Sequence, residues 1–216
     1  MPDIFDEVES DLRAERTRRF FTRYAGALIA LLVLIVAAAG GFEAWKYYRQ
    51  RDLLRVSNAY LAAQRLADAT SPDRPAAIAA FAKVAGEGSA GYRTLSLLRE
   101  AALKADAGDL AGASTLWDEV AGDGSSAPLL RDLASLLWVM HHIDSPESGQ
   151  IESRLQPLLA PENAWHALAQ EMAAVLDIKQ GKTDAARTAL KQLAQDVTAP
   201  AGVRGRANGL LQQLGG

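Results

Sequence analysis

Side chains that commonly catalyse reactions or bind metals are few in this chain. Its only histidines are His141, His142 and His166, and cysteine is absent. Neighbouring residues of a helix point about 100° apart, so His141 and His142 lack the i, i+4 spacing with which two helical histidines hold one metal ion. The absence of cysteine excludes disulfide bonds, thiolate metal sites and a cysteine nucleophile. We therefore expect no metal site.

Other chemical motifs are also missing or incomplete. The glycine-rich segment 122–126 lacks the lysine and the preceding strand of a phosphate-binding loop. No Gly-x-Ser-x-Gly motif of a serine hydrolase is present. The acidic pairs Asp118/Glu119 and Asp106/Asp109 have the residue types for acid–base catalysis, but solvated helix faces and helix caps are the commoner explanation. We expect no enzyme activity, no cofactor and no small-molecule substrate.

Composition favours helices in most of the chain. Residues 56–216 contain 14 basic and 18 acidic residues, a net charge of −4, and no basic patch that would indicate nucleic-acid binding. Alanine is abundant there and β-branched residues are scarce, which is typical of helices rather than strands. The predicted fold class is all-α.

One stretch, residues 25–42, is long and apolar enough to cross a membrane. It contains no charged or strongly polar side chain, and its eighteen residues reach about 27 Å as a helix, close to the thickness of the hydrocarbon core of a bilayer. Aromatic and basic residues flank it on both sides, as is typical of lipid–water interfaces. We interpret it as a single transmembrane helix.

Two alternatives to a permanent anchor are a buried core helix and a signal peptide cleaved after the run Ala37-Ala38-Ala39. Apolar residues on every face argue against the first. The preceding 24-residue tail is long and rich in acidic residues, unlike the short basic start of a signal peptide.

Two small-residue pairs, Gly26/Ala30 and Ala37/Gly41, have the spacing with which another membrane helix could pack.

Basic residues near this helix give only a slight orientation preference. Five lie before it and four after it, which favours a cytoplasmic N-terminus. The predicted organisation is a charged cytoplasmic tail (1–24), a transmembrane helix (25–42) and a helical-repeat domain (43–216).

The rest of the chain reads as amphipathic helices separated by Gly, Pro and Asp. Residues 43–69 contain no Gly or Pro and continue the membrane helix. The helices predicted after it are Pro75–Glu87, Ala90–Ala107, Leu110–Ala121, Pro128–Ile143, Glu147–Leu159, Ala164–Gln180, Thr183–Asp196 and Pro200–Leu214. Their short connections predict antiparallel neighbours.

An internal repeat lies within this series of helices. A glycine is followed by a small residue five positions on and by a bulky apolar residue nine positions on. The first copy has Gly108, Ala113 and Trp117, and the second has Gly181, Ala186 and Leu190. The glycine is suited to a left-handed cap, and the small residue permits close helix packing. The bulky residue then fills the space between helix pairs.

This pattern resembles the tetratricopeptide repeat, although the usual signature of its first helix is missing. The predicted architecture is an α-solenoid of degenerate tetratricopeptide-like helix pairs. Partner binding in a groove of such a stack is then expected. Tyr92 and Trp165 are candidates for that groove, whereas we interpret Trp117 and Trp138 as core residues.

The whole chain is similar to the YfgM-like family, the ancillary subunit of the SecYEG translocon. The similarity rests on Arg18-Arg19-Phe20-Phe21 before the span, Trp45-Lys46-Tyr47-Tyr48 after it, Ser57-Asn58-Ala59-Tyr60 and the degenerate repeats. It implies a single-pass protein of the bacterial inner membrane with its repeats in the periplasm. The implied partners are SecYEG and a periplasmic chaperone or membrane-anchored prolyl isomerase. The family offers no catalytic residues.

Three other functions remain open from the sequence. The chain could be an envelope-assembly scaffold or regulator that is not bound to the translocon. It could be an enzyme with an unrecognised polar pocket, or its repeat domain could lie in the cytoplasm.

Overall fold

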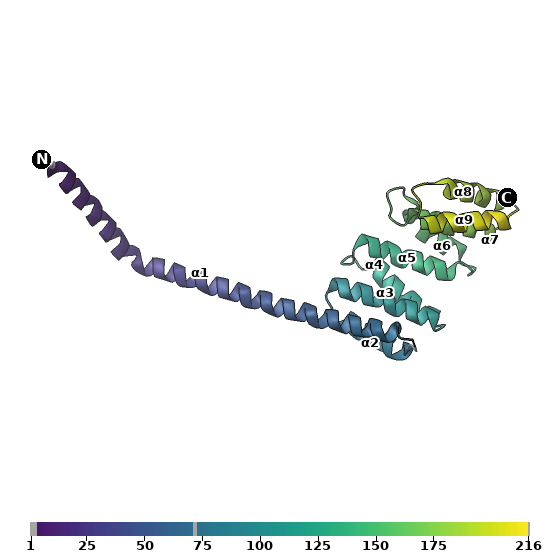
Figure 1. The fold of residues 1–216 in the computed structure, drawn as a ribbon, viewed down its shortest axis with the longest axis horizontal. Coiled ribbons are helices and arrows are strands. Elements are labelled where there is room, and N and C mark those ends of the chain that lie inside the picture. The colour runs from purple at the N-terminus through teal and green to yellow at the C-terminus, as the bar shows by residue number, and fades with distance from the viewer. Residues whose placement is uncertain (1–3, 71–72, 216) are drawn as a thin grey trace. The chain divides into compact units, whose positions relative to one another are not determined.

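The computed structural model describes residues 4–70 and 73–215 of the chain, without the side chains of residues 4–24 and of Leu28. It divides into two compact units, Met1–Leu54 and Arg55–Gly216. Every regular element in the described ranges is a helix (Figure 1). The all-α prediction is therefore confirmed for this part of the chain. The side chains of the predicted charged tail, 1–24, lie outside the described residues.

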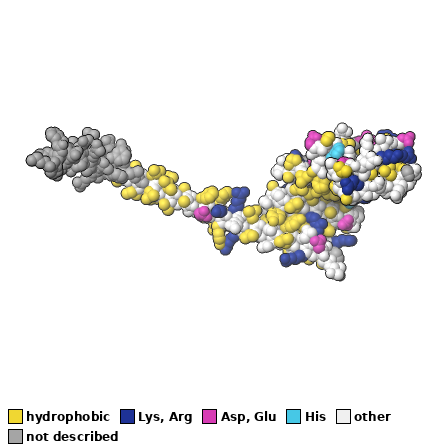
Figure 2. Space-filling view, turned by 45° about the horizontal axis from the view of Figure 1, so that its top comes forward, with side chains coloured by type: hydrophobic (Ala, Val, Ile, Leu, Met, Phe, Trp, Pro, Cys, Tyr) yellow, Lys and Arg dark blue, Asp and Glu magenta, His cyan; other side chains and the backbone are white. Residues whose placement is uncertain are grey.

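The first unit consists of helix α1 (Ile4–Ala67) up to Leu54. Residues 25–54 of α1, Leu28 excepted, are exposed, and large apolar side chains such as Leu34 and Val36 are 66% and 64% accessible. Figure 2 shows apolar side chains along this helix, followed by acidic and basic side chains. Within the described residues α1 is the one helix long and apolar enough to cross a membrane.

Aromatic and basic side chains follow this apolar stretch on α1. The Arg49 guanidinium lies 5.1 Å from the Trp45 ring centroid, and that of Arg51 lies 4.6 Å from the Tyr47 centroid. Stacked cation–aromatic pairs suit the headgroup region, where rings and cations both find polar neighbours.

The second unit contains residues 55–67 of α1 and the helices that follow. These are α2 (Arg74–Glu87), α3 (Ala90–Asp106), α4 (Leu110–Gly122), α5 (Pro128–His142), α6 (Ser148–Leu155), η1 (Gln156–Leu159), α7 (His166–Lys179), α8 (Thr183–Gln195) and α9 (Ala201–Gln213). The predicted helices agree with these bounds to within a few residues, except in two places.

The first difference is the predicted helix Glu147–Leu159, which is split into α6 and the 3₁₀ helix η1. Pro157 lacks a backbone N–H and cannot continue an α-helical ladder, but it is well suited to the first turn of a new helix. The second difference is the start of α7, at His166 rather than Ala164. The Asn163 side-chain oxygen accepts the Trp165 amide at 2.8 Å and so stabilises a turn there.

Packing in the second unit follows the order of the chain. From α2 to α5, and again from α7 to α9, each helix packs on the next, and α6 with η1 connects α5 to α7. Contacts of α3 with α5, α5 with α7 and α7 with α9 join the first helices of successive pairs into one row. This is the packing of a helical-repeat solenoid.

Candidate partner-binding surfaces

The two repeat glycines end α3 and α7 in the same way. Gly108 and Gly181 have φ of +86° and +75°, in the left-handed region. The Gly108 amide donates to the Ala105 carbonyl at 2.9 Å, and the Asp109 amide donates to the Lys104 carbonyl at 2.9 Å. Gly181 and the residue after it repeat this pattern at 3.0 and 2.8 Å. Both ends are Schellman caps, so the sequence repeat corresponds to a repeated local structure.

The first repeat adds an N-cap that the second lacks. The Asp109 carboxylate accepts the Gly112 amide at 2.9 Å and lies 3.2 Å from Lys104 Nζ. The Gly112 amide, and then Lys104, hold the pKa of Asp109 below its usual range. A Cβ at Gly112 would lie 2.2 Å from that carboxylate, so a larger residue there would require the Asp109 side chain to shift. In α8 the equivalent N-cap is Lys182, which makes no side-chain capping bond.

The packing residues of the repeats lie in the core. Ala113, Trp117, Ala186 and Leu190 are all 0% exposed. Trp117 belongs to the central cluster of α3 to α7, and Leu190 to the cluster of α7 to α9. The indole nitrogen of Trp117 is buried without a hydrogen-bond partner. These positions therefore hold the stack together and offer no surface to a partner.

Two of the histidines pack on tryptophan rings. The His142 ring stacks on Trp138 with centroids 3.9 Å apart, and the Arg154 guanidinium lies 4.1 Å from the Trp138 centroid. His141 lies 4.7 Å from the Trp117 ring. Trp138 is 3% exposed, as expected of a core residue. Among the side chains that the structure describes, no cluster of three His, Asp or Glu is arranged to hold a metal ion.

The candidate groove residues Tyr92 and Trp165 lie far apart in the order of packed helices, on α3 and just before α7. Tyr92 is half-buried, with its ring 5.6 Å from that of Tyr60. Trp165 is also half-buried, and its indole N–H donates to the Leu129 carbonyl at 2.9 Å. Both side chains are already engaged within the stack, and the structure does not bring them into one site. The membrane candidates Gly26, Ala30, Ala37 and Gly41 are all exposed on α1.

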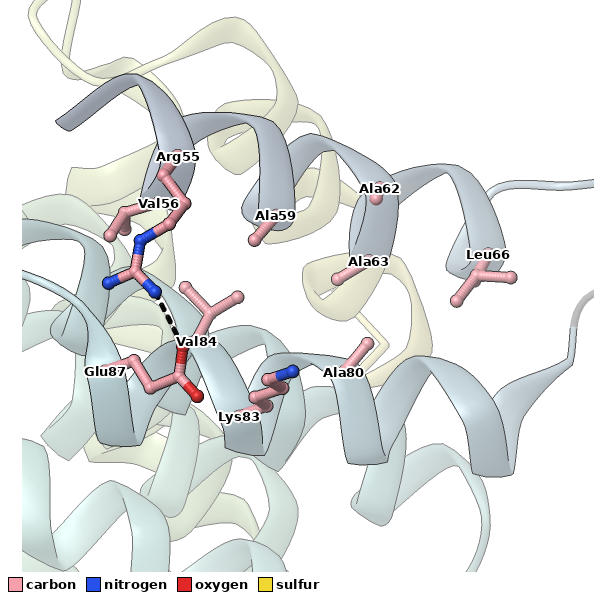
Figure 3. Close-up of a pocket in the computed structure, with 10 residues that line it drawn as sticks. All are labelled: Arg55, Val56, Ala59, Ala62, Ala63, Leu66, Ala80, Lys83, Val84 and Glu87. Carbon is pink, nitrogen blue, oxygen red and sulfur yellow. Dashed lines mark ion pairs between the residues drawn. The ribbon is translucent and has the colours of Figure 1, made fainter. Parts of the chain in front are cut away.

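Sequence reasoning missed a groove between α1 and α2, both sides of which belong to the second unit. Its volume is about 330 Å³. The lining residues are Arg55, Val56, Ala59, Ala62, Ala63, Leu66, Ala80, Lys83, Val84 and Glu87 (Figure 3). The floor is apolar, since Ala63 is 0%, Val84 4% and Val56 5% exposed, while Ala59 and Ala62 remain exposed along one wall.

Charged side chains stand at the rim of this groove. Arg55 and Glu87 form an ion pair of 3.7 Å across one end (Figure 3). Lys83 is exposed on α2, and no ion-pair partner of it lies among the described residues. The sequence signal for this surface is the series Arg55, Ala59, Ala62, Leu66, which runs beside the buried or half-buried series Val56, Tyr60, Ala63, Ala67.

A second unpredicted feature is a buried ion pair between α7 and α9. The Glu171 carboxylate is 4% exposed and accepts two hydrogen bonds of 2.6 Å from Arg206. This bidentate pair raises the pKa of the guanidinium. It borders an apolar hollow of about 370 Å³ formed with Val175, Gly209 and Leu210. The pair fastens the last helix to the stack.

Comparison with known proteins gives one match. The model of the tetratricopeptide repeat-like domain family matches residues 18–212, which is most of the chain. No curated protein and no solved structure matches the chain.

Proposed function

Because the chain belongs to the tetratricopeptide repeat-like family, we propose that it is a membrane-tethered protein-binding module that acts by docking partners and not by catalysis. The observation that carries the proposal is the extent of the match. It begins at residue 18, before the apolar stretch of α1, and ends in α9, so the apolar helix and the repeats belong to one family architecture. Anchoring a binding domain at a membrane raises its local concentration near membrane-bound partners.

The nature of the surfaces supports binding rather than chemistry. The groove between α1 and α2 is lined mainly by alanines, valines and a leucine, with charges only at its rim. His142 stacks on Trp138, His141 packs against Trp117, and the buried Glu171 carboxylate is paired with Arg206. Such surfaces suit helices or extended segments of other proteins.

We further propose that the module lies in the periplasm and assists exported proteins beside the SecYEG translocon, with a periplasmic chaperone or membrane-anchored prolyl isomerase as a second partner. This assignment depends on the similarity to the YfgM-like family. The bacterial inner-membrane location depends on the same similarity, and the slight excess of basic residues before the apolar stretch supports an N-terminus in the cytoplasm.

Two experiments test these proposals. Protease added to intact spheroplasts should remove the second unit and leave a membrane-embedded N-terminal fragment. Protection of the second unit until the cells are lysed would contradict the periplasmic assignment.

The partner is tested by crosslinking in native membranes and purification in mild detergent. SecY and a periplasmic chaperone are expected among the crosslinked proteins. A matched control joins Arg55–Gly216 to an unrelated single-span anchor, which separates partners of the repeats from partners of the membrane helix. Absence of translocon subunits from the full chain would refute the translocon assignment.

A further inference from the structure

We propose that the α1–α2 groove binds one amphipathic helix of a partner protein, a helix with an apolar face flanked by carboxylates. The inference rests on the proposed function in one respect, that the second unit binds proteins. It goes further by assigning the surface and the chemistry of the segment that occupies it.

The dimensions of the groove fit a helix. From Arg55 to Leu66 it follows α1 for twelve residues, about 17 Å at 1.5 Å per residue, or three helical turns. Four of its ten lining residues are alanines, and such small side chains allow a third helix to approach to the short end of the usual interaxial distance of about 8–10 Å. Leu66, 38% exposed, stands at one end of the groove as an apolar contact.

The position of the groove in the stack indicates that it requires a partner. Terminal repeats of a solenoid usually present a polar outer face to water. The last helix, α9, exposes the polar side chains Asn208, Gln212 and Gln213, and the apolar hollow beside it is bordered by the Glu171–Arg206 ion pair. The first pair, α1 with α2, instead presents an apolar groove with both Ala59 and Ala62 exposed. Burying that surface against another helix is favourable in proportion to its apolar area.

The charged residues around the groove indicate what kind of partner helix it can bind. Residues 55–67 of α1 and helix α2 carry four basic residues and one acidic residue, Glu87; the basic ones are Arg55, Arg65, Arg74 and Lys83. Two more acidic residues, Asp68 and Asp73, lie in the connection between these helices, so residues 55–87 have a net charge of +1. Residues 88–216 have 11 basic and 15 acidic residues, a net charge of −4, so this edge is weakly positive on an otherwise negative domain. A carboxylate beside Lys83 would neutralise an exposed cation that has no partner in the described chain.

The same charges disfavour two other occupants. A second copy of this edge would place like charges against one another, which is unfavourable. A small molecule would need polar groups that converge inside the hollow, whereas the charged groups here stand at the rim. An acidic amphipathic helix satisfies both the apolar floor and the positive rim.

The test uses the full chain in lipid nanodiscs and a fluorescent model helix of 14 residues, the length of α2. This peptide has leucines on one face flanked by glutamates, and its control has lysines in place of the glutamates. Fluorescence anisotropy should show at least tenfold tighter binding of the acidic peptide. Equal binding of the two peptides, or no binding of the acidic one, would overturn the proposal.

Variants of the chain locate the binding. Ala62→Phe fills the groove and should abolish saturable binding, whereas Ala82→Phe, exposed on α2 outside the groove, should leave it unchanged. Lys83→Glu should weaken binding roughly fivefold, whereas Lys191→Glu on α8 should have no effect. Circular dichroism verifies that each variant is folded, and Ala59→Phe serves as a second filled groove.

Failure of this inference differs from failure of the proposed function. If Ala62→Phe and Lys83→Glu chains still crosslink to their partners in membranes as the wild type does, the groove assignment is wrong and the binding function stands. If the acidic peptide binds as expected but no partner crosslinks, the groove assignment stands and the translocon proposal falls. Self-association of the chain that Ala62→Phe removes would assign the groove to a second copy and overturn the proposal.

Discussion

Replacing Arg206 by methionine should release α9 from the stack. The Glu171 carboxylate is 4% exposed and depends on two 2.6 Å hydrogen bonds from Arg206, so the variant leaves a buried charge without its partner. Breaking a buried pair in this way typically costs about 3–5 kcal/mol. Because the Arg206 side chain is 54% exposed, water can partly replace it, and we expect a loss near the lower end, about 2–3 kcal/mol.

Urea unfolding of the full chain in detergent, followed by far-UV circular dichroism, measures this loss. Hydrogen exchange should show that it concentrates in α9. The double variant Glu171→Leu/Arg206→Met, which removes both charges, should lie within about 1 kcal/mol of the wild type.

The matched control is the exposed ion pair of Arg93 and Glu119, whose side chains are 42% and 40% accessible. Arg93→Met should cost less than about 1 kcal/mol. If Arg206→Met is equally mild, then Glu171 is well hydrated and the reasoning from burial is wrong.

Three further predictions concern the repeats. Gly108→Ala places a side chain in the left-handed region and should lower the free energy of unfolding by about 1–2 kcal/mol. Gly209→Ala lies in an open helical position of α9 and should raise the free energy of unfolding by about 0.5–1 kcal/mol. Thermal unfolding distinguishes the two variants. Trp117→Ala should lower the free energy of unfolding by about 3–5 kcal/mol. Trp117→Phe should stay within about 1 kcal/mol of the wild type, because it also removes a buried N–H that has no partner. A large loss for Trp117→Phe in urea unfolding would indicate a hidden hydrogen bond. The pKa of Asp109 is lowered in the folded state, so the Asp109 carboxylate stabilises the fold above about pH 3.9, and this contribution is lost as the pH falls through the lowered value. The melting temperatures of wild type and Asp109→Ala should therefore differ at neutral pH and converge in strong acid.

Local signals account for the success of the sequence-based helix boundaries. Asp73 caps α2, as its side chain accepts the Ala76 amide at 3.1 Å, and Pro75 lies in the first turn. Gly108 and Gly181 end their helices in a conformation that few other residues adopt. Each of these residues acts on its own neighbours in the chain, so its effect can be read from sequence alone.

The binding surfaces depend on tertiary neighbours and could not be predicted in the same way. Ala62 and Ala63 are adjacent and chemically identical, yet Ala63 is 0% exposed against α2 and Ala62 lines the open groove. Glu171 finds its partner 35 residues away on another helix. Trp165 could have been an anchor or a core residue, and a hydrogen bond to the Leu129 carbonyl, 36 residues distant, determines its placement.

The packing of most helices on their immediate successors also governs how the chain acquires its structure. Partners close in sequence require little loop closure, and proteins dominated by such contacts fold quickly. As the chain emerges N-terminus first from a ribosome, α2 can pair with the end of α1 before α5 has appeared. Each later helix would pack on a surface that the preceding helices already form. The order of synthesis is thus also the order of assembly, and a half-emerged chain exposes the unpaired face of its most recent helix.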